Sequence, residues 1–175
     1  ESMRFLGGLR FEVYSAKLIA QMRRYSMTLT YTDQPVTEEE MQGFDAELNG
    51  PKWSTFKGDS IFFMLANMPW MGSNLHFSPP TKTDDGHNDI FNLGGNEVGR
   101  LGLTSFLLKM EGGGHFRNGT LVPRSGATHH RVKAFRLDPT GQRKGVYSID
   151  GERYDAEPIQ GIVLEKALNI YSLNQ

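Results

Sequence analysis

Apolar residues recur along the chain with two spacings, and the spacing predicts which segments form helices and which form strands. Residues 9–25 and 99–110 have apolar positions at the helical period, so we expect two amphipathic helices. The helix at 9–25 is basic, so it either packs its apolar side on the domain or serves as a calmodulin-type target or a membrane-surface element. Ser26–Thr32 alternates strictly between polar and apolar residues, which is typical of a half-buried strand. Ser60–Ala66 is a continuous apolar run, which predicts a strand covered on both faces.

Further strands are expected at Asn88–Leu93, at Arg131–Leu137, and as a final pair at Ile159–Val163 and Ala167–Tyr171. The pattern therefore has six to eight strands and two principal helices, without the βαβ alternation of a parallel sheet. Twenty glycines and eight prolines imply many turns. We predict a mainly β fold, an antiparallel β-sandwich-like domain or partly open barrel with two flanking helices.

Residues 145–155 read as a hairpin, because Asp150-Gly151 lies between two alternating runs. Both positions of such a turn favour positive φ, which makes Asp-Gly a strong hairpin signal. A hairpin alone needs no function, so the functional interpretation depends on the other residues of the chain.

Residues 33–58 resemble a loop insertion, punctuated by Pro35, Gly50 and Pro51. Thr37 and Glu40 fit a capping box, which predicts a short acidic helix within the insertion. We assign no chemistry to this segment.

Composition limits the class of protein. The 175 residues suit one well-packed domain, and 19 basic against 20 acidic residues argue against a nucleic-acid partner. The absence of cysteine excludes disulfides, thiolate zinc sites and cysteine nucleophiles. No apolar run reaches the ~20 residues that span a bilayer. The sequence starts abruptly, and we expect residues 1–175 to be part of a longer protein.

Several kinds of site do not fit the sequence. The glycine clusters lack the strand and helix that a phosphate loop needs, and the turn at Asp84–Asp89 lacks the alternating carboxylates of a calcium loop. His129 and His130 are adjacent, so on a strand they point to opposite faces and cannot share a metal. We therefore predict no metal ligands and no catalytic residue.

Two groups of residues remain as candidates. Arg4 and Arg10 flank a Gly7-Gly8 pair and could bind an anion, although two solvated arginines would look the same. A second group of adaptable apolar residues could line a lipophilic pocket or form an ordinary core. Its members are Phe62, Met64, Leu75, Phe91, Leu103, Phe106, Leu107 and Met110.

Five segments, in order, resemble the C-terminal lobe of the sphingosine kinases, within the diacylglycerol kinase superfamily. They are Met3–Phe11, Ser78–Asp89 with its Asp-Gly turn, Lys109–Phe116 with its Met-Glu-Gly-His pattern, Ala134–Leu137 and Lys144–Glu152. The resemblance does not cover residues 33–58 or 117–128. Within the latter, Leu121–Ser125 resembles a thrombin-type cleavage site.

The resemblance implies a parent enzyme that transfers the γ-phosphate of ATP to the primary hydroxyl of a long-chain sphingoid base. The nucleotide-binding lobe with the general base would precede this chain, and Mg2+ would not be bound by this lobe alone. Arg4 and Arg10 would bind the ATP phosphates. Asp150, Gly151 and Glu152 would approach the nucleotide from the hairpin.

The apolar group, joined by His115, would line a buried channel for the lipid tail. The family implies a cytoplasmic, peripherally membrane-associated protein that binds a sphingoid-base lipid and ATP, with a possible homodimer. A diacylglycerol or ceramide kinase lobe is the related alternative, and a non-catalytic lipid-binding module is the alternative from another class.

Overall fold

The computed structural model describes residues 9–41, 43–44, 47–73, 75–96, 98–142 and 145–167, and the fold is mainly β with two α-helices, as predicted. Its elements are α1 (Leu9–Gln21), β1 (Tyr25–Thr32), the 3-10 helix η2 (Glu39–Met41), β2 (Ser54–Ala66), β3 (Asn88–Gly94), α2 (Arg100–Met110), β4 (Phe116–Arg117), β5 (Thr120–Leu121), β6 (Ala127–Val132), β7 (Ala134–Pro139), β8 (Val146–Ile149), β9 (Glu152–Asp155) and β10 (Ile159–Ile162).

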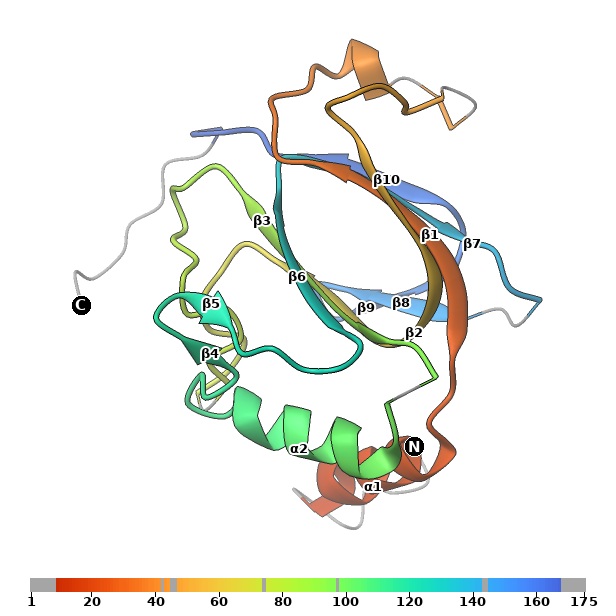
Figure 1. Cartoon of the computed structure of the whole chain (residues 1–175), viewed down its shortest axis with the longest axis vertical. Coiled ribbons are helices and arrows are strands. Elements are labelled where there is room, and N and C mark those ends of the chain that lie inside the picture. The colour runs from red at the N-terminus through yellow and green to blue at the C-terminus, as the bar shows by residue number, and fades with distance from the viewer. Residues whose placement is uncertain are drawn as a thin grey trace.

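Six strands form one antiparallel sheet in the order β10-β7-β1-β2-β3-β6. The sheet curls strongly (Figure 1), because β6 at one edge continues directly into β7, next to the other edge. Lys133 is the single residue between them. Its amide donates to the Thr32 carbonyl at 2.7 Å, and its carbonyl accepts from the Val163 amide at 2.8 Å. The result is close to the partly open barrel that the strand pattern predicted.

This geometry contradicts the single strand expected at Arg131–Leu137. The chain instead breaks at Lys133 into β6, which pairs with β3, and β7, which pairs with β1 and β10. Basic and apolar residues alternate through the break without a glycine or proline, so the local pattern contains no sign of it.

Strand β2 begins at Ser54, six residues before the predicted start, and residues 54–58 of the expected loop belong to the sheet. The strand is also less covered than predicted, since only Ser60 is buried and the residues after it are half-buried. A register shift between Ser60 and Phe62 marks a bulge. Such bulges bend a strand, which suits a curled sheet.

The rest of the expected insertion is held against the sheet by Arg136 of β7. This side chain is 6% exposed, and its guanidinium donates to the Gln160 amide oxygen and to the carbonyls of Gly43 and Phe44 at 2.7 to 3.1 Å. The predicted capping box is confirmed, because the amide of Thr37 donates to Glu40 and the amide of Glu40 donates to the Thr37 hydroxyl.

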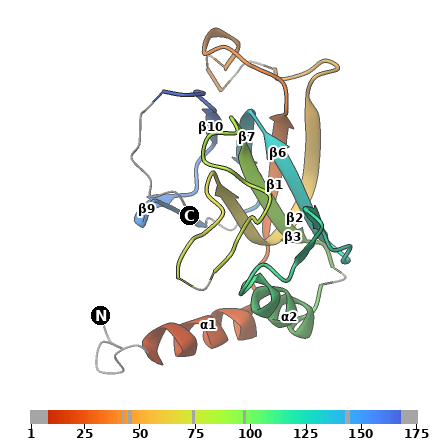
Figure 2. The same ribbon diagram turned by 90° about the vertical axis from the view of Figure 1, so that its left-hand side faces the viewer.

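Helices α1 and α2 lie together at one end of the sheet (Figures 1 and 2). Helix α1 ends at Gln21, four residues before the predicted end, and its packing is only partly as expected. Ile19 packs on the domain, whereas Val13 and Leu18 are exposed. The Arg100 side chain of α2 donates to the Ala20 carbonyl at 2.9 Å and joins the two helices.

The C-terminal part contains the predicted hairpin, β8–β9, as a separate two-stranded sheet. The strand expected at Ile159–Val163 is β10, which pairs with β7. The partner strand expected at Ala167–Tyr171 falls almost wholly outside the described residues. The face of the sheet that is turned away from α2 is covered by an apolar cluster built on Leu29, Ile90 and Leu137.

Candidate functional site

The largest apolar cluster lies between α2 and the sheet, and we call it the helix-side cluster. Its buried members are Phe77, Phe91, Leu93, Val98, Leu103, Phe106 and Met110. Half-buried residues packed against them include Phe62, Met64, Leu75 and Leu107. The structure thus brings all eight predicted apolar residues together in one cluster.

Helix α2 supplies one wall of this cluster. Leu103, Phe106 and Met110 are buried, as the helical period predicted. The helix ends where predicted, and Gly112 and Gly113 follow with φ of 63° and 76°, a conformation that favours glycine. The Phe106 ring meets the Phe62 ring of β2 edge-to-face, with centroids 6.0 Å apart.

Phe91 of β3 is the centre of the aromatic packing. It is fully buried, and its ring stacks on His129 at 4.5 Å between centroids and meets Phe77 edge-on at 4.6 Å. His115 and Phe116 pack edge-on against the same ring. Such pairs prefer the offset and T-shaped arrangements seen here. Phe91 therefore connects the segment after α2, strand β6 and the loop before β3.

His115 packs against the aromatic rings of the helix-side cluster. Its Nε2 lies 2.7 Å from the Phe77 carbonyl oxygen, and its ring lies edge-on to Phe106. Burial lowers the pKa of His115, while the carbonyls of Phe77 and Lys109 act in the opposite direction. We therefore treat the ring as neutral, with Nε2–H donating to Phe77. The side chain can accordingly face a lipid without bringing a charge.

A pocket of about 240 Å3 opens beside the cluster. It is lined by Phe106, Lys109, His115, Val122, Pro123 and Arg124. Pockets that hold a drug-sized ligand usually measure about 300–1,000 Å3. The side chains of the cluster therefore fill most of the space that a long lipid tail would need.

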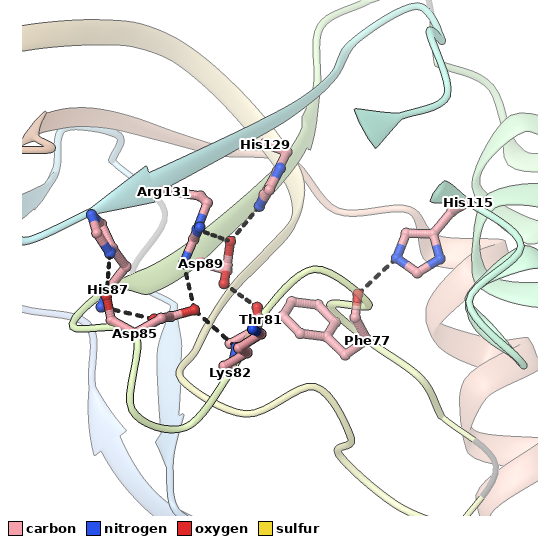
Figure 3. A network of polar contacts seen from close by, with 9 residues as sticks. All are labelled: Phe77, Thr81, Lys82, Asp85, His87, Asp89, His115, His129 and Arg131. Carbon is pink, nitrogen blue, oxygen red and sulfur yellow. Dashed lines mark hydrogen bonds and ion pairs between the residues drawn. The ribbon is translucent and has the colours of Figure 1, made fainter. Parts of the chain in front are cut away.

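A polar network fixes the turn before β3 to the sheet (Figure 3). Asp89 is its hub, because this buried carboxylate accepts from the Thr81 hydroxyl and lies 2.5 Å from His129 Nε2. Arg131 donates to Asp85 at 2.5 Å and lies 3.8 Å from Asp89.

Burial alone would raise the pKa of Asp89, but the hydrogen bonds from His129 and Thr81, with the charges of His129 and Arg131, lower it below its usual value. The carboxylate is therefore ionised and fully engaged. His130 points to the other face, towards Tyr31, as predicted. Within the described residues, no group of three or more His, Asp or Glu side chains is placed to hold a metal ion.

The hairpin tip has the expected backbone, with φ of 50° at Asp150 and 89° at Gly151. Both residues and Glu152 are exposed, and among the described residues, apart from Gly151 and its chain neighbours, no atom lies within 4 Å of where a Cβ on Gly151 would be. The Glu152 carboxylate accepts from the Tyr154 hydroxyl at 2.9 Å. The tip can therefore present carboxylates and open backbone to a ligand.

The proposed arginine pair cannot be placed beside this tip. Arg4 lies outside the described residues, and for Arg10 only the backbone, within α1, is described. Their expected role remains a prediction.

Known proteins share both parts of the sequence and the fold of this chain. No family model matches the chain. It is 26% identical to sphingosine kinase 1 of Arabidopsis thaliana over 87% of its length, and 26% identical to sphingosine kinase 1 of Mus musculus over 93%. A crystal structure of a candidate diacylglycerol kinase from Bacillus anthracis has the same fold, with a TM-score of 0.51 at 17% identity over 87% of the chain.

These similarities support a C-terminal lobe of the diacylglycerol kinase-like superfamily. The chain spans 35% of the plant relative, 45% of the mouse relative and 41% of the bacterial structure. Neither α-helix in the described part of this chain has the length and hydrophobicity to cross a membrane.

Sequence reasoning missed important parts of the lobe. Phe77, Leu93 and Val98 are buried in the helix-side cluster but were not predicted there. Phe77 lies in an irregular loop, where no periodic pattern marks burial. The Asp89 network was missed because Asp89 and His129 are 40 residues apart, and only the register of β3 against β6 joins them.

Proposed function

We propose that this lobe binds the lipid and contacts ATP in a sphingosine kinase-like enzyme that phosphorylates the primary hydroxyl of a long-chain sphingoid base. The observation that carries the proposal is the helix-side cluster, in a chain whose relatives are sphingosine kinases. All eight apolar residues that the resemblance assigns to lipid contact meet in that cluster.

The lipid tail would enter the cluster between α2 and β3. Burial of more than ten methylenes contributes on the order of 10 kcal/mol gross, at ~0.8 kcal/mol each. Because the cluster is nearly filled, α2 would have to move outwards. The N-terminus of α2 supports this, because Gly99 provides no side-chain cap, and no atom of the other described residues lies within 4 Å of where a Cβ on Gly95 or Gly99 would be. Gly94 is less suited to a hinge, since a Cβ there would lie 2.1 Å from the Asp59 carbonyl oxygen.

The nucleotide would be contacted by Asp150, Gly151 and Glu152, together with Arg4 and Arg10. The exposed hairpin fits this role, because its carboxylates can accept hydrogen bonds and its backbone can be approached closely. ATP would supply the phosphoryl group, and a divalent cation such as Mg2+ would accompany its phosphates. On the family pattern, the phosphate-binding motif and the general base would belong to another lobe of the parent enzyme. A cytoplasmic location, contact with a membrane surface and a homodimer stay predictions.

A diacylglycerol or ceramide kinase lobe is the second candidate. Its basis is the fold shared with the bacterial structure. The helix end Lys109–Phe116, with the buried His115, favours the sphingosine kinase alternative because it resembles that family.

The test is ATP-dependent phosphorylation of sphingosine, ceramide and diacylglycerol by the full-length parent, with each lipid dispersed in detergent micelles. We expect phosphate transfer to sphingosine. Transfer to diacylglycerol or ceramide alone would favour the second candidate. No transfer to any of the three would refute a kinase and leave the non-catalytic lipid-binding module.

A further inference from the structure

A loop between β2 and β3 exposes large apolar side chains. We call residues 67–73 and 75–77 the Trp70 loop. Within it Met68 is 52% exposed, and Trp70 and Met71 are each 45% exposed. Three large apolar side chains exposed within four positions are costly in water unless something covers them.

The loop is ordered by its own contacts. Trp70 and His76 form a β-bridge, and their rings stack in parallel with centroids 4.0 Å apart. The Met71 amide donates to the Leu75 carbonyl at 3.0 Å, and the Ser78 amide donates to the Pro69 carbonyl at 3.1 Å. These contacts therefore fix the loop in a conformation in which Trp70 and Met71 are exposed.

The charge pattern favours a bilayer interface as the occupant. From Ser60 to Thr81 the sequence contains no Asp, Glu, Lys or Arg. Tryptophan is enriched at the level of lipid headgroups, where its ring is apolar and its N–H can be hydrated. An element without carboxylates can enter that layer without desolvating a charge.

The base of the loop adjoins the proposed lipid site and the neighbouring pocket, which contains the cations Lys109 and Arg124. Leu75 and Phe77 pack in the helix-side cluster, and Leu75 forms a β-bridge with Glu111 at the end of α2. Lys109 and Arg124 line the neighbouring pocket, and neither forms an ion pair with any described residue. Such cations complement anionic lipid headgroups.

We propose that the Trp70 loop is a membrane anchor that inserts Met68, Trp70 and Met71 into the interfacial layer of an anionic bilayer, next to the lipid-binding cluster. The inference rests on the proposed function for the lipid that the cluster takes, but membrane insertion can be measured without phosphoryl transfer. Lys109 and Arg124 add an electrostatic attraction that salt weakens.

Fluorescence tests the insertion directly, because the chain has only two tryptophans. Trp53→Phe leaves Trp70 as the sole indole. With vesicles of phosphatidylcholine containing phosphatidylserine, we expect a blue shift of Trp70 emission and strong quenching by lipids brominated near the headgroup. Vesicles of phosphatidylcholine alone should bind more weakly. Binding to anionic vesicles without shift or quenching would overturn the proposal.

A second experiment compares two variants of the chain by vesicle sedimentation. Trp70→Ala/Met71→Ala should weaken partition into the anionic vesicles about tenfold or more. The matched control Leu164→Ala removes another exposed apolar side chain, after β10, and should bind as the unmodified chain does. Equal partition of all three proteins, or an effect of the double variant on self-association instead, would contradict a membrane anchor and favour a protein partner or a second copy.

Activity of the parent separates this inference from the proposed function. The double variant should phosphorylate sphingosine in detergent micelles at the normal rate, and sphingosine in vesicles at a reduced rate. Failure on micelles by the unmodified parent refutes the kinase. Equal loss on micelles and vesicles would refute the anchor alone.

Discussion

The helix-side cluster and the β8–β9 hairpin are expected to serve one reaction, yet the structure builds them very differently. The cluster is assembled from α2, β2, β3 and the loops around them, and its central ring, Phe91, has no exposed surface. The hairpin has two four-residue strands in a sheet of their own, with an exposed tip. Under the proposed function, a lipid site would be complete within this lobe, whereas the hairpin would need a second surface to enclose a nucleotide. The two regions should therefore respond differently to substitution.

The largest effect is expected at the centre of the cluster. Phe91→Ala should lower the free energy of unfolding by about 3–5 kcal/mol, because it leaves a cavity among closely packed aromatic rings. Urea denaturation monitored by circular dichroism measures this change. The matched change in the hairpin, Ile149→Ala, should cost less than about 1 kcal/mol because its side chain is partly exposed. Equal losses would contradict the contrast between the two regions.

A smaller loss is expected in the polar network that supports the cluster. Asp89→Asn removes the charge that His129 and Arg131 face, and should cost about 1–3 kcal/mol at neutral pH. The pKa of Asp89 is lowered in the folded state, so its contribution is present above the unfolded pKa of about 3.9 and is lost as pH falls through the folded value.

The difference in stability between the two proteins should therefore shrink below about pH 4. Denaturation midpoints from pH 7 to pH 3 provide the measurement. A difference that stays constant over this range would show that the charge of Asp89 does not contribute.

Kinetics of the full-length parent should separate the regions by substrate. Glu152→Ala should raise KM for ATP by about tenfold, equivalent to ~1.4 kcal/mol, and leave stability unchanged because the side chain is exposed. Phe106→Ala should raise KM for the lipid instead. Initial rates at varied ATP and varied sphingosine test both variants. If both variants changed the same KM, the assignment of the hairpin to ATP and of the helix-side cluster to the lipid would be wrong.

The smallest effect is expected at the base of the hairpin. Burial, aided by the charge of Asp138, raises the pKa of Tyr147 to about 12, and its hydroxyl has no hydrogen-bond partner among the described residues. Tyr147→Phe should therefore change stability by less than about 1 kcal/mol, and could increase it. Thermal unfolding detects the change. If Tyr147→Phe lowered the free energy of unfolding by about 2 kcal/mol or more, the hydroxyl would have a hydrogen-bond partner, because such a loss is typical of a buried polar group whose partner has been removed.

The periodic parts of the chain could be predicted from the sequence, because burial on one side leaves a local pattern. Helix α2 and its buried face followed from the spacing of Leu103, Phe106 and Met110, and the hairpin from Asp150-Gly151. Lys133 shows the limit. At Lys133 one alternating run breaks into two strands that lie towards opposite edges of the sheet. Only the closure of the sheet requires that break.

Long-range contacts were equally hidden. Arg136 is one of the basic residues of the alternating run at Arg131–Leu137, yet it is buried because the segment at Gly43 and Phe44 folds over it. Asp89 and His129 meet only through strand register. Periodicity describes what a residue does in its own element, whereas these contacts depend on which elements become neighbours.

The central claim is that the lipid half of the site is complete in this lobe and the nucleotide half is not. Isothermal titration of the 175-residue chain with a short-chain sphingosine and with ATP·Mg2+ tests it most directly. We predict saturable one-to-one binding of the lipid, weakened by Phe106→Ala, and no measurable binding of the nucleotide. Nucleotide binding without lipid binding would contradict the claim.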